Sequence, residues 1–452
     1  MSEQPARESF ASKFGIIAAA AGSAIGLGNI WRFPYVAGEN GGGAFILIYL
    51  IFIFAIGVPV LLSEFIIGRN TRSNPYRAFK KLKPNQPWYL VGVVGIGAAF
   101  MIMAFYSAVA GWTLEYLFQS ISDGFTGKNP DQLNSMFLNF RDETLRPVLW
   151  QIIFMIMTAF IVLAGVKKGI EKYTKILMPF LLVIIIILDI KALTLPGASQ
   201  GLEFLFKPDF SKLSANAILE ALGQAFFSLS IGMGTLITYG SYISKKDNMA
   251  NSAVVVSIAD TAIAILAGVA IFPAVFAFNI EPNAGTGLVF ITLPNIFQQM
   301  SGGYFFSLLF FLLLTLAALT SSISVLEVVV AFFVENLKMK RKNATIFATI
   351  STAYLGTLCA MSWGGFSGFE LFGYNFFSLL DFLASNVLLP LGGLFIAVFV
   401  GWFYGKGKTF REISNNGKLK VQYLSIFMFL LKYIAPVAVG LVFLYSVGII
   451  RF

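Results

Sequence analysis

The chain has 452 residues, of which 57% are hydrophobic and 12% are charged. Because soluble domains usually carry about 25% charged residues, this composition excludes an ordinary soluble domain and indicates a protein that faces lipid. The net charge is +10, histidine is absent and Cys359 is the single cysteine, which excludes histidine acid–base chemistry, imidazole metal ligands and an intrachain disulfide framework.

Eleven apolar segments are long enough to cross a bilayer, which takes about 20 residues of helix. Helices are expected because open sheet edges cannot be satisfied in hydrocarbon. We therefore predict an all-α, polytopic membrane protein with one transmembrane domain over residues 1–452. The predicted spans are 12–36, 42–68, 88–121, 147–165, 173–194, 216–243, 250–279, 303–335, 343–362, 373–404 and 424–449. The short apolar stretch 286–300, which contains Pro294, predicts a re-entrant or surface helix.

Basic residues alternate between the loops. The loops 69–83, 166–175, 336–342 and 405–420 are rich in Lys and Arg, whereas 122–146 and 195–215 hold few and 280–302 holds none. Basic loops stay in the cytoplasm, so we expect a cytoplasmic N-terminus and, after eleven spans, an outer C-terminus. This topology explains the positive net charge, and we expect no nucleic acid partner.

Two predicted spans are interrupted by glycine. The first contains Gly22, Gly26 and Gly28, and the sixth contains Gly232 and Gly234. Close packing through small residues would explain either span alone. The two are, however, the first spans of residues 12–194 and 216–404, and interrupted spans at matching positions of two halves indicate a transporter site. We predict two inverted repeats, helices 1–5 and 6–10, with helices 1 and 6 broken, followed by helix 424–449.

A broken helix can bind both a cation and a carboxylate. The break frees carbonyl oxygens for a cation, and the half-helix N-terminus that follows it presents amides and a partial positive charge to an anion. One site between the two breaks could therefore hold a sodium ion and a zwitterion together.

Long motifs in this chain resemble those of a known family. The run Gly26-Leu27-Gly28-Asn29-Ile30-Trp31-Arg32-Phe33-Pro34, followed by Glu39-Asn40-Gly41-Gly42-Gly43-Ala44-Phe45, closely resembles the signature of the neurotransmitter:sodium symporter family. The segments 224–230 and 319–324 are similar to its sixth and eighth helices. The resemblance covers nearly the whole chain and implies a bacterial, eleven-helix, sodium-dependent amino acid transporter of the leucine-transporter fold, in the cell (inner) membrane.

The resemblance implies two sodium sites made of oxygen donors. The first would use the carbonyl of Ala24 and the side chains of Asn29, Ser228 and Asp260, with the substrate carboxylate completing the shell. The second would use the carbonyls of Gly22, Ile25 and Ala317 and the hydroxyls of Thr320 and Ser321. Helical hydroxyls otherwise usually bond to their own backbone.

The resemblance also implies a substrate pocket. The substrate carboxylate would meet the amides of Leu27 and Gly28 and the hydroxyl of Tyr106. The remaining contacts would come from Ala24, Ile102, Phe227, Ser230, Met233, Ser321 and Val325. Taken singly, the apolar residues are also explained by core packing. Together they indicate a hydrophobic or aromatic L-amino acid, with another small zwitterion left open.

Gates and a hinge follow from the same resemblance. The outer gate would pair Arg32 with Asp381. The inner gate would pair Arg7 with Glu335, beside Tyr242 and Phe10, which stands where the family commonly has tryptophan. Gly169 and Pro179 enclose nine residues, the family's spacing for a segment of helix 5 that unwinds, although an ordinary kink would also explain this proline. Glu64 and Glu327 are buried acids that serve either as ligands or as partners of broken backbone.

The resulting expectation is a sodium-coupled symporter that works by alternating access. Asp260 supplies a fixed negative charge near sodium, so we expect transport without chloride. A channel would need a ring of charges, which is not visible. An intramembrane enzyme would need a base beside Thr320 or Ser321, and none is evident. A non-transporting amino acid sensor of the same fold stays open, as does the oligomeric state.

Overall fold

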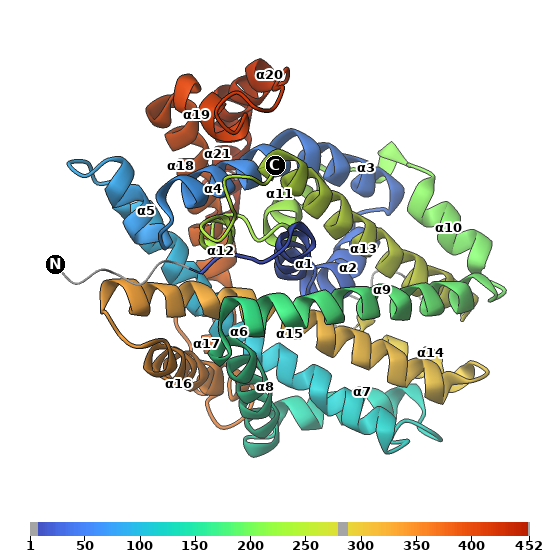
Figure 1. Ribbon diagram of the computed structural model, residues 1–452. Helices are drawn as coiled ribbons and strands as arrows, with labels where there is room; N and C mark the ends of the chain where they lie inside the picture. Colours follow the sequence, from blue (N-terminus) through green and yellow to red (C-terminus); the bar gives the residue numbers. More distant parts are fainter. Residues whose placement is uncertain (1–7, 279–287, 451–452) are drawn as a thin grey trace.

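The computed structural model describes residues 8–278 and 288–450 (Figure 1). Within this part the chain is helical, and its single bridge of β type joins Leu371 and Tyr374. The prediction of an all-α protein is confirmed.

Each of the eleven predicted spans corresponds to one helix or to a run of consecutive helices. The first five are α1 (Lys13–Ala24) with η1 (Gly28–Arg32) and α2 (Phe33–Glu39); α3 (Gly43–Phe52) with η2 (Ile53–Gly57) and α4 (Val58–Thr71); α6 (Tyr89–Ile121); α8 (Leu145–Leu163); and η3 (Val166–Glu171) with α9 (Lys172–Leu193). The next five are α11 (Ala215–Ser228) with α12 (Thr235–Gly240); α13 (Met249–Ala277); α15 (Gly303–Asn336); α16 (Arg341–Ala360); and α17 (Phe376–Asp381) with η6 (Phe382–Leu388), α18 (Leu389–Val398) and η7 (Phe399–Tyr404). The last is α20 (Leu424–Phe429) with η8 (Leu430–Ile434) and α21 (Ala435–Ser446).

Short helices connect the spans. They are α5 (Pro75–Leu82), α7 (Pro130–Asp142), α10 (Ala198–Phe206), η4 (Phe210–Lys212), α14 (Thr292–Gln299) and α19 (Lys406–Ile413). Helix α14 occupies most of the predicted stretch 286–300 and, at 8 residues, is too short to span a bilayer. Residues 286 and 287 lie outside the described residues.

Some of the helices begin directly after a capping side chain. Ser12, Asn74, Ser214 and Asn248 each precede a helix and accept a hydrogen bond from a backbone N–H of its first turn. Such caps satisfy amides that have no partner inside the helix. Whether a helix can cross the membrane then depends on its length and on how apolar it is. In the described part, 8 helices are long and apolar enough to do so, or 9 if the bent pair α1 and η1–α2 counts as one span.

Both predicted breaks are present. The halves of the first span are bent by 50°, with Ile25 extended between them. In the sixth span, residues 229–234 are not helical, and Gly232 and Gly234 have φ of +88° and +74°. Glycine takes these angles without a Cβ clash, which explains why the chain breaks here. The remaining spans pack around the breaks, with α1 in the middle of the bundle in Figure 1.

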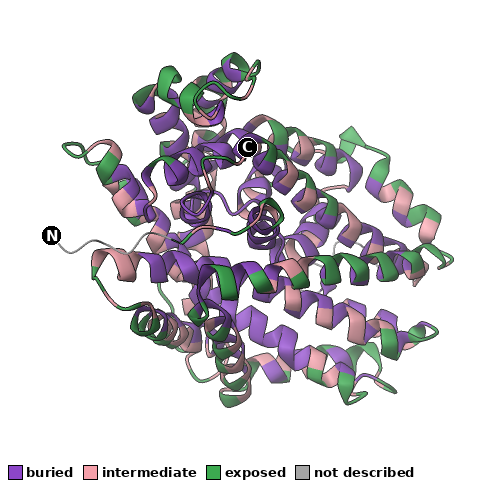
Figure 2. Cartoon of the chain, in the orientation of Figure 1, coloured by how far each residue is buried: buried purple, intermediate pink, exposed green. Residues whose placement is uncertain are grey.

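The surface of the bundle is apolar over a wide area. Buried residues fill the interior in Figure 2, while large apolar side chains such as Phe160, Ile190, Ile350 and Val437 are exposed on α8, α9, α16 and α21. Exposed apolar surface of this extent is typical of a lipid-facing protein.

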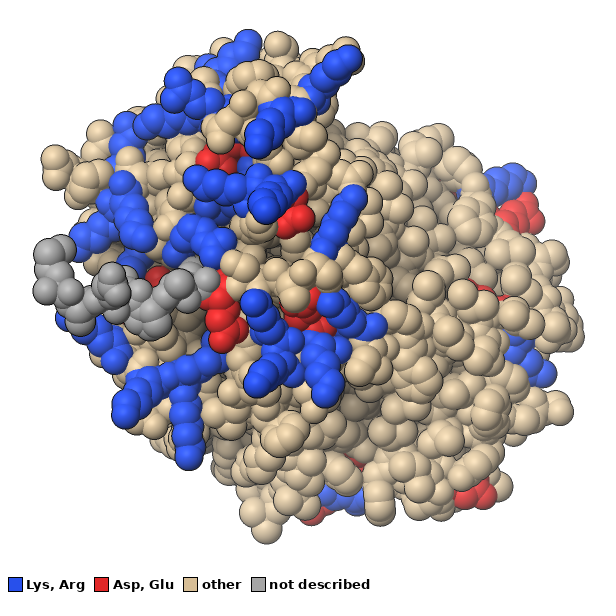
Figure 3. All heavy atoms as spheres, in the orientation of Figure 1, with Lys and Arg blue, Asp and Glu red and all other residues tan. Residues whose placement is uncertain are grey.

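Lys and Arg gather at one end of the bundle. In Figure 3 they cover the left of the view, over the end that carries α5 and α19. We call this the basic end; it comprises the loops 69–83, 166–175, 336–342 and 405–420.

Candidate functional site

The first break brings a cluster of oxygen atoms together. Ser321 Oγ lies 3.3 Å from the carbonyl oxygen of Gly22 and 3.1 Å from that of Ile25. Thr320 Oγ1 lies 3.4 Å from the Ile25 oxygen and 3.0 Å from the Ala317 oxygen. The five oxygen atoms predicted to bind the second sodium ion therefore lie close together. The carbonyl oxygen of Ser23, 3.2 Å from Ser321 Oγ, adds a sixth. Such an all-oxygen set suits a hard cation.

A second polar cluster joins the first break to α11 and α13. The Asn29 amide donates to Asp260 Oδ1 at 2.7 Å and to Ser228 Oγ at 3.1 Å, and Ser228 Oγ donates to Asp260 Oδ2 at 2.7 Å. All three side chains are buried. Asp260 has no ion-pair partner in the described part of the chain. Burying a charged carboxylate costs free energy unless a cation lies beside it. The three side chains predicted for the first sodium site thus meet.

A small cavity of about 30 Å³ lies between the two breaks. The predicted pocket residues line it, apart from Leu27, and Ser23 and Gly26 line it too: Ser23, Ala24, Gly26, Gly28, Ile102, Tyr106, Phe227, Ser230, Met233, Ser321 and Val325. Leu27 contributes through its backbone, since its N–H donates to Tyr106 Oη at 3.1 Å. Ile102, Phe227, Met233 and Val325 give the pocket apolar lining, and Ser321 of the first oxygen cluster lines it as well.

Position 26 has no room for a side chain, so a glycine is needed there. A Cβ on Gly26 would overlap Ser321 Oγ and lie 2.8 Å from Tyr106 Oη. The backbone at the break can therefore approach a bound molecule more closely than any other residue would allow.

Two broken helices, two oxygen clusters and one pocket between them have close parallels among known proteins. Residues 7–136 and 136–451 match the Sodium:neurotransmitter symporter family. The chain belongs to this symporter family. It is accordingly a multi-pass membrane protein of a family of sodium-dependent transporters, rather than of enzymes.

Relatives of this symporter cover its whole length. The sodium-dependent transporter YhdH of Bacillus subtilis is 40% identical over 452 residues, which is 100% of both chains. A sodium-dependent transporter of Haemophilus influenzae is 36% identical and covers 97% of this chain and 98% of its own. The crystal structure of MhsT in complex with L-phenylalanine is 46% identical, with a TM-score of 0.90, and covers 97% of this chain and 100% of its own.

The symporter holds a second, larger cavity of about 610 Å³, between α2, α11, α18 and α21. Arg32 and Phe227 both line it, and the Arg32 guanidinium lies 4.7 Å from the centre of the Phe227 ring. Asp381 accepts a hydrogen bond from Ser385 at 2.8 Å. No ion pair joins Arg32 and Asp381, both of which are described, so the outer gate stays a prediction.

The inner gate is described in part. Arg7 lies outside the described residues. Glu335 accepts hydrogen bonds from the backbone and side-chain amides of Asn74 at 3.0 and 2.9 Å. The Phe10 ring is buried and makes edge contacts with Tyr239 and Tyr242 at 5.7 and 5.8 Å between centroids. Phe10 therefore packs against Tyr239 and Tyr242, and the inner gate stays a prediction.

The hinge residues of the fifth span differ in their surroundings. Gly169 lies in the π-helix η3, where a Cβ would overlap the carbonyl oxygen of Ile161. Pro179 lies inside α9, which continues past it. The π-helical turns begin at Val166 and end at Glu171, before the proline. Unwinding of this segment stays a prediction.

The two buried acids have protein partners. Glu64 accepts a hydrogen bond from the N–H of Gly232, in the sixth-span break, at 2.8 Å. Glu327 pairs with Arg341 at 2.7 Å and accepts a hydrogen bond from Tyr242 at 2.7 Å. These contacts favour the structural reading of both acids over the reading as ligands.

Sequence reasoning missed three site residues. Tyr49 donates a hydrogen bond to Ser228 Oγ at 3.3 Å, and Ser23 and Gly26 line the pocket. Tyr49 sits in an apolar run with no local signal. Gly26 begins the recognised motif and Ser23 lies three residues before it, in a stretch where the density of small residues could have indicated both.

Proposed function

We propose that this symporter moves hydrophobic or aromatic L-amino acids together with sodium by alternating access. The observation that carries the proposal is that both oxygen clusters and the pocket include residues of one break, residues 22–29. A cation and a zwitterion bound there would touch the same few peptide groups.

Coupling would follow from this shared break. The Tyr106 hydroxyl, which accepts a hydrogen bond from the N–H of Leu27, can donate its own proton to a substrate carboxylate. A carboxylate at that position would complete the shell of the sodium beside Asn29 and Asp260. Sodium would then raise the affinity for substrate, and substrate would raise the affinity for sodium by the same factor.

The pocket walls support a hydrophobic side chain. Ile102, Phe227, Met233 and Val325 supply apolar surface, and Met233 can adapt to several shapes. The similar protein MhsT was crystallised with L-phenylalanine. Because the cavity measures only about 30 Å³, these side chains would move apart to admit an aromatic ring.

Two further features complete the proposal. Asp260 supplies a fixed negative charge in the cluster with Asn29 and Ser228, so chloride would not be needed. With the basic end in the cytoplasm, the N-terminus would face the cytoplasm of the inner membrane. Two sodium ions crossing about 100 mV down a roughly tenfold gradient would then supply about 7 kcal/mol for concentrating a neutral substrate.

Uptake by purified protein in liposomes tests the proposal. We expect L-phenylalanine or L-leucine to accumulate with an inward sodium gradient, with potassium in its place giving none and gluconate in place of chloride changing nothing. Sodium-dependent binding without uptake would instead support the sensor, and flux that neither saturates nor accumulates substrate would support a channel.

A further inference from the structure

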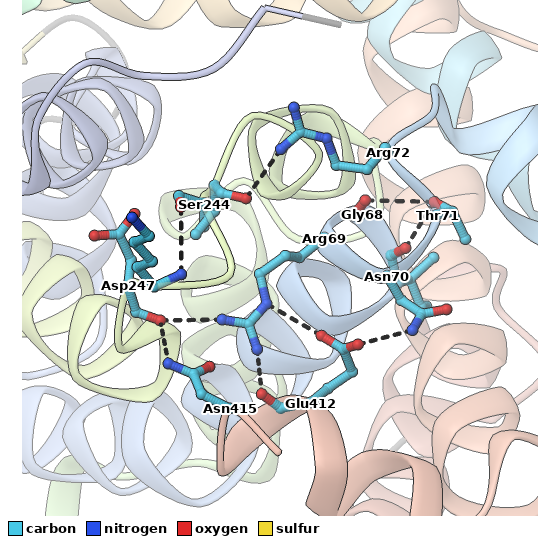
Figure 4. Close-up of polar contacts among 12 residues, drawn as sticks. Gly68, Arg69, Asn70, Thr71, Arg72, Ser244, Asp247, Glu412 and Asn415 are labelled. Carbon is cyan, nitrogen blue, oxygen red and sulfur yellow. Dashed lines mark hydrogen bonds and ion pairs between the residues drawn. The ribbon is translucent and has the colours of Figure 1, made fainter. Parts of the chain in front are cut away.

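Arg69 is a buried cation that the sodium sites and the pocket do not use. Its side chain is 1% exposed, at the last turn of α4. The guanidinium donates to Glu412 Oε2 at 3.1 Å, to the main-chain carbonyl of Glu412, and to the carbonyl of Asp247 at 3.0 Å. Figure 4 shows these contacts joining α4, α19 and the loop that follows α12.

Neighbouring amides complete the cluster. Asn70 donates to Glu412 Oε1 at 2.8 Å, and Asn415 donates to the carbonyl of Asp247 at 3.1 Å (Figure 4). Both carboxylate oxygens of Glu412 are therefore engaged, and its side chain is 13% exposed. An ion pair this deeply buried needs good geometry to persist, unlike a surface pair.

Helix α4 is locked to α12. A Cβ on Gly68 would overlap the carbonyl oxygen of Ile237, and one on Gly240 would lie 2.9 Å from the Cα of Phe65. The two backbones are thus in direct contact, and Glu64 of α4 holds the N–H of Gly232 beside the pocket. We call α4 and α12 the paired unit, because a movement of either one carries the other and the sixth-span break.

The tenth span meets this paired unit at two places. Near the pocket, a Cβ on Gly392 of α18 would overlap the carbonyl oxygen of Gly232. At the basic end, Arg69 reaches Glu412 of α19, which begins 2 residues after η7 ends at Tyr404. Any separation of the paired unit from α19 at the basic end breaks the Arg69–Glu412 contact.

We propose that Arg69 is a positioning residue for transport. Its contact with Glu412 holds the paired unit against α19, and this contact breaks when the amino acid and sodium leave toward the basic end. The inference rests on the proposed function. Arg69 forms several charge-assisted hydrogen bonds at once, so the contact favours the state that is closed at the basic end.

A single introduced cysteine can report this opening. Cys359, the one native cysteine, is buried and can be replaced by alanine. Val328 on α15 is fully buried and faces the start of α12, since a Cβ on Gly234 would lie 3.7 Å from its Cγ1. Because α12 moves with α4 in the paired unit, we expect release from α19 to part α12 from α15, and only then would a water-soluble maleimide react with the Val328→Cys reporter.

The experiment compares maleimide reaction rates in sodium buffer with L-phenylalanine. We expect Glu412→Gln to speed labelling about fivefold or more, the lower end of usual coupling between linked sites. Arg69→Lys keeps the charge but loses the planar fork, so its labelling rate should be intermediate. Asn70→Ala, which removes one bond to Glu412 and spares both charged partners, should give a smaller increase and covers the case in which Glu412→Gln does not fold.

Glu115→Gln is the matched control. Glu115 is 2% exposed and pairs with Arg146 at 2.6 Å, outside the basic end. Its substitution should leave labelling unchanged. Unchanged labelling in Glu412→Gln and Asn70→Ala, or equal acceleration in Glu115→Gln, would overturn the inference. If the unsubstituted protein lacked sodium-dependent uptake, the proposed function itself would be wrong; unaltered labelling alongside normal uptake defeats only the role of Arg69.

Discussion

Asn29 links the first break to α11 and α13 through its hydrogen bonds to Ser228 and Asp260. We predict that Asn29→Ala raises the sodium concentration for half-maximal substrate binding about tenfold or more, because a buried polar group that loses its partner costs about 1–3 kcal/mol. Binding titrations of labelled substrate against sodium measure this effect. Asn40→Ala, at the C-terminal end of α2, is the control, and an unshifted sodium curve in Asn29→Ala would contradict the assignment.

Gly26 is the residue where backbone approach to the pocket is closest. We expect Gly26→Ala to abolish substrate binding, because the added methyl group would overlap Ser321 Oγ. Gly97→Ala is the matched control, since a Cβ there meets nothing within 4 Å. That control should bind normally and gain up to about 1 kcal/mol of stability. Normal binding by Gly26→Ala would place the substrate elsewhere.

At the scale of the helical element, Glu64 holds the broken sixth span to α4. A glutamine still offers a carbonyl oxygen to the N–H of Gly232, whereas an alanine does not. We therefore expect Glu64→Gln to melt near the parent temperature and Glu64→Ala to lose about 1–3 kcal/mol of stability. Thermal unfolding in detergent compares them. Equal loss of substrate binding in both, at unchanged stability, would show that the charge itself is needed.

The elements differ in how far the sequence predicts them. The spans follow from apolar length, and both breaks follow from Gly26, Gly28, Gly232 and Gly234, because glycine weakens a helix wherever it stands. The site residues came from the family motif, and the structure brings most of them together. The contact of Arg69 with Glu412 joins residues 343 positions apart, and no local pattern signals a partner at that distance.

For the whole molecule, sodium should stabilise the fold through both oxygen clusters. One site filled at 100 times its dissociation constant contributes about 2.7 kcal/mol. We predict a melting temperature that rises with sodium concentration, rises further with L-phenylalanine, and does not change when gluconate replaces chloride. Potassium at equal ionic strength is the control. Equal stabilisation by potassium would mean that the clusters do not select sodium.

Phe227 borders both the small pocket and the large cavity beside Arg32. Its ring is part of the wall between them, with the Arg32 guanidinium resting on the far side. A ring can change rotamer within nanoseconds when it has room, whereas helices rearrange over microseconds to milliseconds. We therefore expect a change in the Phe227 side-chain torsion to connect the two cavities much faster than the helices rearrange, so that substrate entry and translocation would have different time constants.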